Sequence, residues 1–146
     1  MKLSVIIPFY NELNLINRAV NSVVINSIFF DQVEIILIND GSFEESEIRS
    51  CFENSLNKLI KIVSNNYAKG PGGARNTGLG ILKGDIIAFL DADDFWLPGK
   101  LETQMQEIKK GATFVATSYR FDNSKTIVNP ASSIDIPEDV FLRRGI

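Results

Sequence analysis

Apolar residues recur along this chain in two alternating patterns: short continuous runs, and positions spaced as on one face of a helix. The continuous runs predict buried strands, and they lie at 3–9, 33–38, 60–63, 85–90 and 113–121. The helical spacing predicts helices at 13–28, 48–59 and 74–82, with a fourth from Pro98 onward. Asn11 is a candidate N-cap of the first helix, and Pro98 is a candidate N1 residue of the last. Alternation of strands and helices predicts one α/β domain, with a mainly parallel sheet and helices on both faces.

Polar residues gather where the predicted strands end. Three such clusters lie at 8–12 (PFYNE), 39–42 (NDGS) and 91–94 (DADD). In open α/β sheets, ligands bind at the carboxyl ends of the strands. The topology therefore predicts that the three clusters converge on one rim and form a ligand site there.

The cluster after the run 85–90 contains three carboxylates, Asp91, Asp93 and Asp94. Like charges at this spacing favour a hard divalent metal among them, which also holds phosphate oxygens. Alternation along an extended segment puts Asp91 and Asp93 on one side and Asp94 on the other. One of the pair can hold the metal while the other holds ribose or a metal-bound water, and Asp94 can instead cap the following turn.

The other two clusters each allow two interpretations. Asp40, beside Gly41, can accept a hydrogen bond from a base imide or a ribose hydroxyl, or it can form an Asx-turn that caps the next helix. Tyr10 can stack on a base or pack on the rim. Asn11 and Glu12 can contact a ligand or simply begin the first helix.

Segment 70–76 (GPGGARN) opens a predicted helix with exposed backbone N–H groups, a natural phosphate site. Arg75 lies in the first turn of this helix, where the helix dipole disfavours a cation. A pyrophosphate explains an Arg at this position better than helix stability does. The alternative is that Arg75 pairs with an aspartate of the rim.

Composition limits the chemistry. The 146 residues carry a net charge of −3 and contain no histidine and one cysteine, Cys51, which excludes His-based nucleophilic catalysis and an ordinary structural zinc site. No basic block suggests nucleic acid or an anionic membrane surface, and no apolar run approaches the ~20 residues of a membrane span. The N-terminus enters a strand pattern without a signal-peptide cleavage region, which favours a cytoplasmic protein.

Two nucleotide-binding signatures are missing from the sequence. No G-x-G-x-x-G follows the first strand, which disfavours dinucleotide oxidoreductases. No G-x-x-x-x-G-K-[ST] is present, which disfavours P-loop nucleotidases. A third class, the nucleotidyltransferases that form sugar nucleotides, needs a Gly-rich basic loop after the first strand, and 8–12 does not supply one.

Four segments together resemble the family-2 glycosyltransferases with the GT-A fold. In order, they are 4–12 (SVIIPFYNE), 38–42 (INDGS), 73–79 (GARNTGL) and 89–98 (FLDADDFWLP). They define a motif-bearing core over 3–105. The resemblance implies a Rossmann-like GT-A fold and a single nucleotide-sugar-binding domain over 1–146.

The resemblance also implies roles for single residues. Asp93 corresponds to the metal ligand of the family's D-x-D element, and the metal is Mn²⁺ or Mg²⁺, which clamps the diphosphate leaving group. Asp40 corresponds to the residue that contacts the base, usually uracil, with thymine and guanine as alternatives. The remaining nucleotide-sugar-binding positions are Pro8, Tyr10 and Glu12 at the nucleoside, Arg75 near the diphosphate, and Asp91 as the first acid of D-x-D.

The implied activity is transfer of a sugar from a UDP-sugar to a glycan or lipid-linked acceptor, with inversion and a carboxylate base. Polysaccharide or lipopolysaccharide synthesis in the cytoplasm, peripheral to the inner membrane face, is expected. Weak base candidates are Glu138 and Asp139, which also begin a predicted helix at 138–144. Residues 122–146 are expected to start an acceptor-side region in a chain that continues further. The alternative is a domain that binds a nucleotide sugar without turnover, because the base region is missing.

Overall fold

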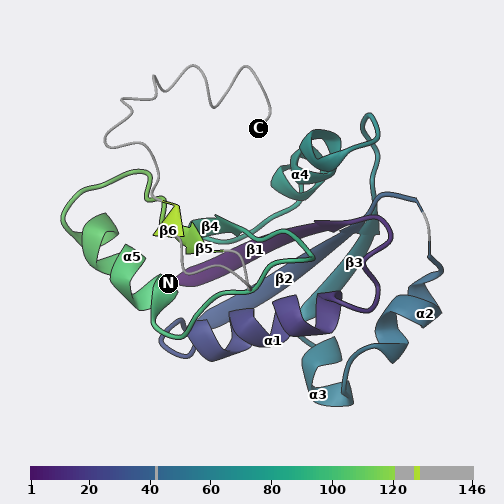
Figure 1. The fold of residues 1–146 in the computed structure, drawn as a ribbon, viewed down its shortest axis with the longest axis horizontal. Helices are drawn as coiled ribbons and strands as arrows, with labels where there is room; N and C mark the ends of the chain where they lie inside the picture. The colour runs from purple at the N-terminus through teal and green to yellow at the C-terminus, as the bar shows by residue number, and fades with distance from the viewer. Residues whose placement is uncertain (42, 121–126, 129–146) are drawn as a thin grey trace.

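The computed structural model describes residues 1–41, 43–120 and 127–128 of the chain. Its main sheet has four parallel strands in the order β3-β2-β1-β4 (Figure 1). Their bounds are β1 Lys2–Phe9, β2 Gln32–Asn39, β3 Ile60–Ser64 and β4 Ile86–Phe89. A separate antiparallel pair joins β5 (Tyr119–Arg120) to β6 (Ile127–Val128). The parallel sheet predicted from the apolar runs is confirmed.

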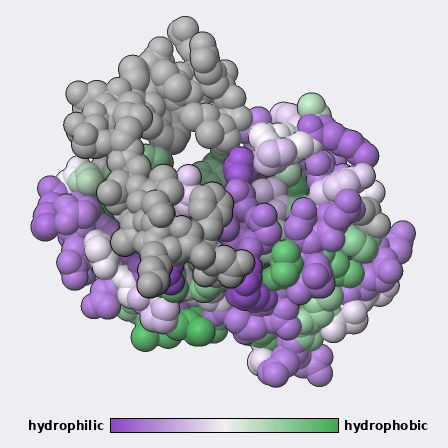
Figure 2. All heavy atoms as spheres, in the orientation of Figure 1, coloured by the Kyte–Doolittle hydropathy of each residue, from purple (hydrophilic) through white to green (hydrophobic). Residues whose placement is uncertain are grey.

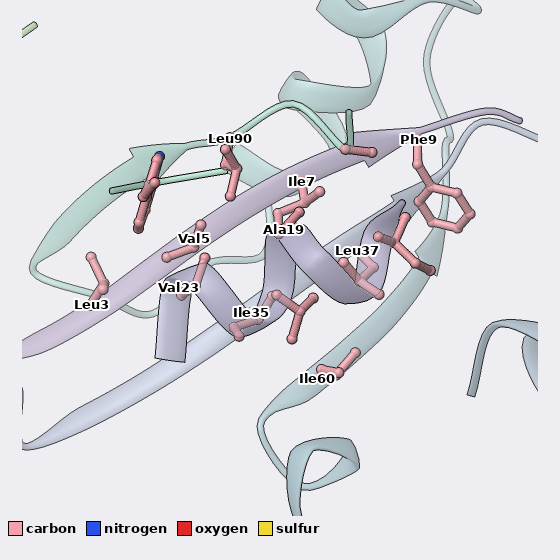
Figure 3. Packing of buried hydrophobic residues seen from close by; sticks show 14 of the residues in the cluster. Leu3, Val5, Ile7, Phe9, Ala19, Val23, Ile35, Leu37, Ile60 and Leu90 are labelled. Carbon is pink, nitrogen blue, oxygen red and sulfur yellow. The ribbon is translucent and has the colours of Figure 1, made fainter. Parts of the chain in front are cut away.

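Helices cover both faces of this sheet. They are α1 Ile16–Asn26, α2 Glu45–Ser50, α3 Asn54–Asn57, α4 Pro71–Leu79 and α5 Lys100–Lys109. The larger apolar cluster joins one face of β1 to α1 and α5, and Figure 3 shows Ile7 of β1 beside Ala19 of α1 and Val5 of β1 beside Val23 of α1. A smaller cluster on the other face joins Ile6 to Ala74 of α4. The continuous apolar run of β1 is thus explained by a central strand that is buried on both faces.

The first helix begins later than predicted. It starts at Ile16 with Leu15 as its N-cap, so the prediction of Asn11 as N-cap was wrong. The preceding segment is a turn in which the carbonyl of Glu12 accepts hydrogen bonds from the backbone N–H of Leu15 (2.8 Å) and Ile16 (3.1 Å). The turn uses the polar residues that follow β1 and keeps them at the end of the strand.

Three other helix boundaries differ from the prediction. The helix expected at 48–59 is divided into α2 and α3, because the chain turns between them and Glu53 starts a new helix. Helix α4 begins at Pro71, after Gly70 in a positive-φ conformation (φ +114°). Gly99 is the N-cap of α5 with φ +84°, so Pro98 precedes the helix instead of occupying N1.

The strand expected at 113–121 was wrong over 113–118. Among the described residues of this run, only 119–120 form a strand, β5, and it pairs with β6 instead of joining the main sheet. Phe114 and Tyr119 are more than half exposed. This run therefore has residue types that favour strands but lacks the burial that stabilises a strand. Phe121, the predicted helix at 138–144, and the base candidates Glu138 and Asp139 lie outside the described residues.

The surface seen in Figure 2 is mainly hydrophilic on the side that carries α2 and α4. The carboxyl ends of β1 and β2 point toward this side (Figure 1). Across the part of the chain that the structure describes, no helix has the length and apolar character that crossing a bilayer requires.

Candidate functional site

A cavity of about 220 Å³ lies at the carboxyl ends of the strands, between the segments that follow β1, β2 and β4 and the start of α4. Its lining residues are Pro8, Phe9, Tyr10, Glu12, Asp40, Gly70, Pro71, Ala74, Asp91, Ala92 and Asp93. Of the predicted nucleotide-sugar-binding and metal-binding residues, all but one are therefore in this lining. The exception is Arg75, which contacts the lining residue Asp91. The expected convergence on one rim is what the parallel topology produces.

The segment after β1 is shaped by the side chain of Glu12. One oxygen of its carboxylate, Oε2, accepts hydrogen bonds from the backbone N–H of Tyr10 (2.7 Å) and Asn11 (3.0 Å). The hydrogen bond from Tyr10 is the strongest influence that holds the pKa of the Glu12 carboxyl below its ordinary value of 4.5. Glu12 therefore fixes the backbone that carries Tyr10 to the cavity.

The ring of Tyr10 is 45% exposed at the cavity, so it is not packed into the core. The ammonium of Lys69 lies 5.5 Å from the ring centroid, within cation–π range. This pair offers an aromatic face and a cation to a ligand. Base stacking by Tyr10 remains a prediction.

Asp40 is 8% exposed and joins the end of β2 to the segment before α4. Its Oδ1 accepts a hydrogen bond from the amide of Asn65 (2.6 Å), and its Oδ2 accepts one from the backbone N–H of Gly70 (2.8 Å). The next helix, α2, is instead capped by Glu44, which forms a capping box with Glu47. Capping of the next helix therefore does not account for Asp40.

Sequence reasoning missed the polar network behind Asp40. Thr77, on α4 and 2% exposed, places its hydroxyl 2.8 Å from Oδ1 of Asn65 and 2.7 Å from Oδ1 of Asn66. The signal was available, because Asn65 and Asn66 directly follow β3. The rule that singled out the polar residues after the other three strands applies to this strand as well.

The start of α4 is packed closely against the segment 65–70. A Cβ on Gly73 would lie 1.9 Å from the carbonyl oxygen of Ala68, whereas a Cβ on Gly72 would meet nothing within 4 Å. Only glycine allows this approach at position 73. The close packing holds Gly70, and with it the hydrogen bond to Asp40, at the edge of the cavity.

Arg75 points from the first turns of α4 to the segment after β4. Its guanidinium lies 2.5 Å from Oδ1 of Asp91. This is the alternative considered from the sequence, in which Arg75 pairs with an aspartate of the rim. The Asp91 side chain is 49% exposed, so the pair contributes little to stability. A guanidinium has five N–H donors, so this pairing is compatible with a phosphate contact. The contact of Arg75 with a diphosphate stays a prediction.

The acidic segment 91–94 is a turn, with a hydrogen bond from the N–H of Asp94 to the carbonyl of Asp91 (3.0 Å). The premise of an extended, alternating segment was therefore wrong. Asp91 and Asp93 nevertheless line the same cavity, with Ala92 between them buried at 3% exposure. The turn, anchored by Ala92, brings both carboxylates to the rim.

A row of polar residues on α1 holds the backbone that follows this turn. Arg18 donates to the carbonyl oxygen of Asp93 (2.6 Å), and Ser22 accepts from the N–H of Trp96 (3.0 Å). Oδ1 of Asn26 accepts a hydrogen bond from the backbone N–H of Leu101, in the first turn of α5 (3.4 Å). Sequence reasoning missed this row, although its four-residue spacing interrupts an otherwise apolar helical face.

Within the described residues, no group of three or more His, Cys, Asp or Glu side chains could hold a metal ion. Asp91 and Asp93 still present carboxylates to one cavity beside the start of α4. Hard divalent ions at phosphate sites are usually held by one or two carboxylates together with substrate phosphates. The residues therefore fit an ion that takes most of its ligands from a bound diphosphate.

A larger cavity of about 450 Å³ lies between α2 and the ends of β2 and β3, and none of the residues 91–94 lines it. Its lining includes Glu44, Glu45 and Glu47, which makes it unfavourable for a phosphate. These carboxylates already serve α2: two form its capping box, and Glu45 pairs with Arg49 at 2.7 Å. The smaller cavity is therefore the better candidate.

Comparison with known proteins places this chain in a family. The model of glycosyl transferase family 2 matches residues 4–144. The Escherichia coli protein UDP-Glc:alpha-D-GlcNAc-diphosphoundecaprenol beta-1,3-glucosyltransferase WfgD is 35% identical over 127 residues. That match covers 86% of this chain and 48% of WfgD, so the chain spans about half the length of this relative.

Two solved structures share the fold. S. aureus TarS in complex with UDP-GlcNAc has a TM-score of 0.61 and 29% identity, over 75% of this chain and 32% of that one. The mannosyltransferase PcManGT from Pyrobaculum calidifontis, in complex with GDP-Man and Mn²⁺, has a TM-score of 0.61 and 25% identity, over 71% and 31%. These similarities confirm the expected GT-A fold. With a family model that matches nearly its full length, the chain belongs to glycosyl transferase family 2.

Proposed function

We propose that this chain is the nucleotide-sugar-binding domain of a glycosyltransferase that uses a UDP-sugar. The main support is the cavity that gathers Tyr10, Asp40 and Asp93 at the carboxyl edge of the sheet. The names of two similar proteins support the donor class, since WfgD is named for UDP-Glc and TarS is described with UDP-GlcNAc. The name of WfgD also includes a lipid-linked diphosphate acceptor, which supports a glycan or lipid-linked acceptor here.

In this proposal the nucleoside lies between the segments after β1 and β2. Tyr10 offers its exposed ring to the base, and Pro8 forms the adjacent wall. Asp40 accepts a hydrogen bond from the imide N–H of uracil with an oxygen lone pair that Asn65 and Gly70 do not use. Glu12 holds the backbone of this wall in place.

The diphosphate lies between the start of α4 and the acidic turn. The N-terminus of α4 and the guanidinium of Arg75 attract the phosphate oxygens, and Asp91 orients that guanidinium. Asp93 is the residue to hold Mn²⁺ or Mg²⁺, which when bound supplies Lewis-acid stabilisation of the leaving diphosphate.

Transfer with inversion needs a carboxylate that removes the proton of the acceptor hydroxyl. The candidates Glu138 and Asp139 belong to the region proposed to start the acceptor side, 122–146. The donor site belongs to the core at 3–105. We also place the protein in the cytoplasm at the inner membrane face, where a lipid-linked acceptor would be accessible.

Calorimetric titration of UDP with and without Mn²⁺ tests the donor site. We expect Mn²⁺ to strengthen UDP binding, and Asp93→Ala to abolish that metal-dependent gain. Asp94→Ala is the matched control, because Asp94 is the next carboxylate along the same turn and does not line the cavity. Unchanged metal-dependent binding by Asp93→Ala would contradict the role proposed for Asp93.

A second candidate is a domain that binds the donor without transferring its sugar. Its support is that the residues at the cavity have donor-binding roles in this proposal, and none of them is assigned as the base. Incubation with UDP-glucose and Mn²⁺ distinguishes the two candidates. Release of UDP above the uncatalysed rate would exclude the binding-only function.

A further inference from the structure

A side-chain amide behind the cavity donates a hydrogen bond to Asp40. We propose that Asn65 is a positioning residue that fixes the Asp40 carboxylate, and so sets the preference for a base that carries an imide N–H. This inference rests on the proposed function, because it concerns the same nucleotide site. It adds a residue that lies outside the cavity lining and acts through Asp40.

The amide of Asn65 is fully used within the protein. Its Nδ2 donates to Oδ1 of Asp40 (2.6 Å) and to the carbonyl of Ala68 (3.1 Å). Its Oδ1 accepts from the backbone N–H of Tyr67 (3.0 Å) and from the hydroxyl of Thr77 (2.8 Å). A carboxamide has two N–H donors and two oxygen lone pairs, and each of the four faces a group of the protein, with the one Thr77 proton shared among the oxygens of Asn65, Asn66 and Gly73. Flipping the amide would make the contacts with Asp40, the carbonyl of Ala68 and the N–H of Tyr67 repulsive, so these three contacts fix its orientation.

The backbone of Asn65 is also held. Its N–H donates to the carbonyl of Asn39 (2.8 Å), at the end of the same strand that leads to Asp40. Thr77, which is 2% exposed on α4, ties the side chain to that helix. Asn65 thus connects β2, the segment 65–70 and α4, and its Nδ2 has little freedom to move.

Asp40 is therefore held by donors on both of its oxygens, Asn65 on Oδ1 and Gly70 on Oδ2. These two bonds fix the plane of a side chain that is 8% exposed and still lines the cavity. A carboxylate can accept about four hydrogen bonds, so lone pairs remain for a ligand. The protein decides their direction before the ligand arrives.

A fixed acceptor discriminates between pyrimidines. Uracil presents an N–H at ring position 3, whereas cytosine presents a lone pair there and carries an amino group beside it. The fixed carboxylate attracts the first and repels the second. A carboxylate free to turn could instead accept from the amino group of cytosine. Removing Asn65 should therefore reduce selectivity, in addition to affinity.

The test compares UDP and CDP by calorimetric titration in the presence of Mn²⁺. We expect the wild type to prefer UDP, and Asn65→Ala to reduce the ratio of the two affinities about tenfold, as for the loss of one orienting hydrogen bond. Asn66→Ala is the matched control, because Asn66 is the next residue and also contacts Thr77 (2.7 Å), but it makes no contact with Asp40 among the described hydrogen bonds. This control should keep the wild-type ratio.

Equal weakening of both nucleotides by Asn65→Ala would show a purely structural role and overturn the inference alone. A wild type that binds neither nucleotide would refute the proposed donor site and the inference with it. Circular dichroism tests whether Asn65→Ala is folded. If Asn65→Ala is unfolded, Asn65→Gln is compared with the wild type instead, since it keeps the amide and moves the nitrogen away from Asp40. An unchanged ratio of UDP to CDP affinity in Asn65→Gln would also overturn the inference.

Discussion

Replacing Gly73 by alanine tests whether the segment before α4 is held by close packing. The added Cβ would lie 1.9 Å from the carbonyl oxygen of Ala68 and 3.0 Å from its carbonyl carbon. These are backbone atoms, so the whole segment must move away from the helix. That movement strains or breaks the hydrogen bond from the N–H of Gly70 to Asp40 (2.8 Å).

The expected cost follows from three contributions. Overpacking of this kind costs ~1–3 kcal/mol. Loss of a hydrogen bond to a charged group adds ~1–3 kcal/mol. The better helix propensity of alanine offsets ~1 kcal/mol. We therefore expect Gly73→Ala to lower the free energy of unfolding by about 3 kcal/mol, which at a urea m-value of about 2 kcal/mol/M shifts the midpoint by about 1.5 M.

Gly72→Ala is the matched control, because it lies in the same helical turn and its Cβ would meet nothing within 4 Å. It should leave the midpoint unchanged or raise it, through helix propensity alone. Urea unfolding followed by circular dichroism measures both variants. If Gly73→Ala is as stable as Gly72→Ala, the segment is not packed on α4 as described, and the reasoning fails.

Three further predictions use the same unfolding assay. Gly78→Ala puts a Cβ 2.6 Å from Cγ2 of the fully buried Ile6 and should cost about 1–3 kcal/mol; combining it with Ile6→Ala should cost less than the sum of the two. Ser22→Ala leaves the backbone N–H of Trp96 without its acceptor in a buried position and should cost about 1–3 kcal/mol, so an unchanged midpoint would contradict this contact. The lowered pKa of Glu12 means that its stabilising contribution is complete at neutral pH and is lost as the pH falls from 4.5 through the folded-state pKa. The difference in midpoint between wild type and Glu12→Gln should therefore shrink on acidification, and a constant difference would refute the assignment.

Local pattern was enough to predict the strands of the main sheet. Parallel strands are buried on both faces, so each reads as a continuous apolar run, and β1 and β2 were placed within a residue or two. The rim followed from the same logic, because the carboxyl ends of parallel strands share one edge. Asp40, Asp91 and Asp93 were placed there because each follows the carboxyl end of a predicted parallel strand, and the structure brings them to one cavity.

Helix boundaries and the run at 113–118 were predicted less well, because several local signals compete there. Asn11 is a good N-cap by residue type, yet the turn made by Glu12 delays the helix to Ile16. Within the described residues, 113–118 form no strand although they include β-forming types, and propensity without burial does not make a strand.

The sequence by itself determined where the main strands lie along the chain, the polar rim and the family, because these depend on patterns within a few residues of each other. Tertiary structure alone decided which side chains hold the rim in shape. Asn65 reaches Asp40 across 25 residues, and Arg18 reaches the carbonyl of Asp93 across 75. No periodicity encodes such contacts, since they arise only when strands and helices pack and leave particular donors facing particular acceptors. The positions of the carboxylates are thus readable in the sequence, and their orientation is a property of the fold.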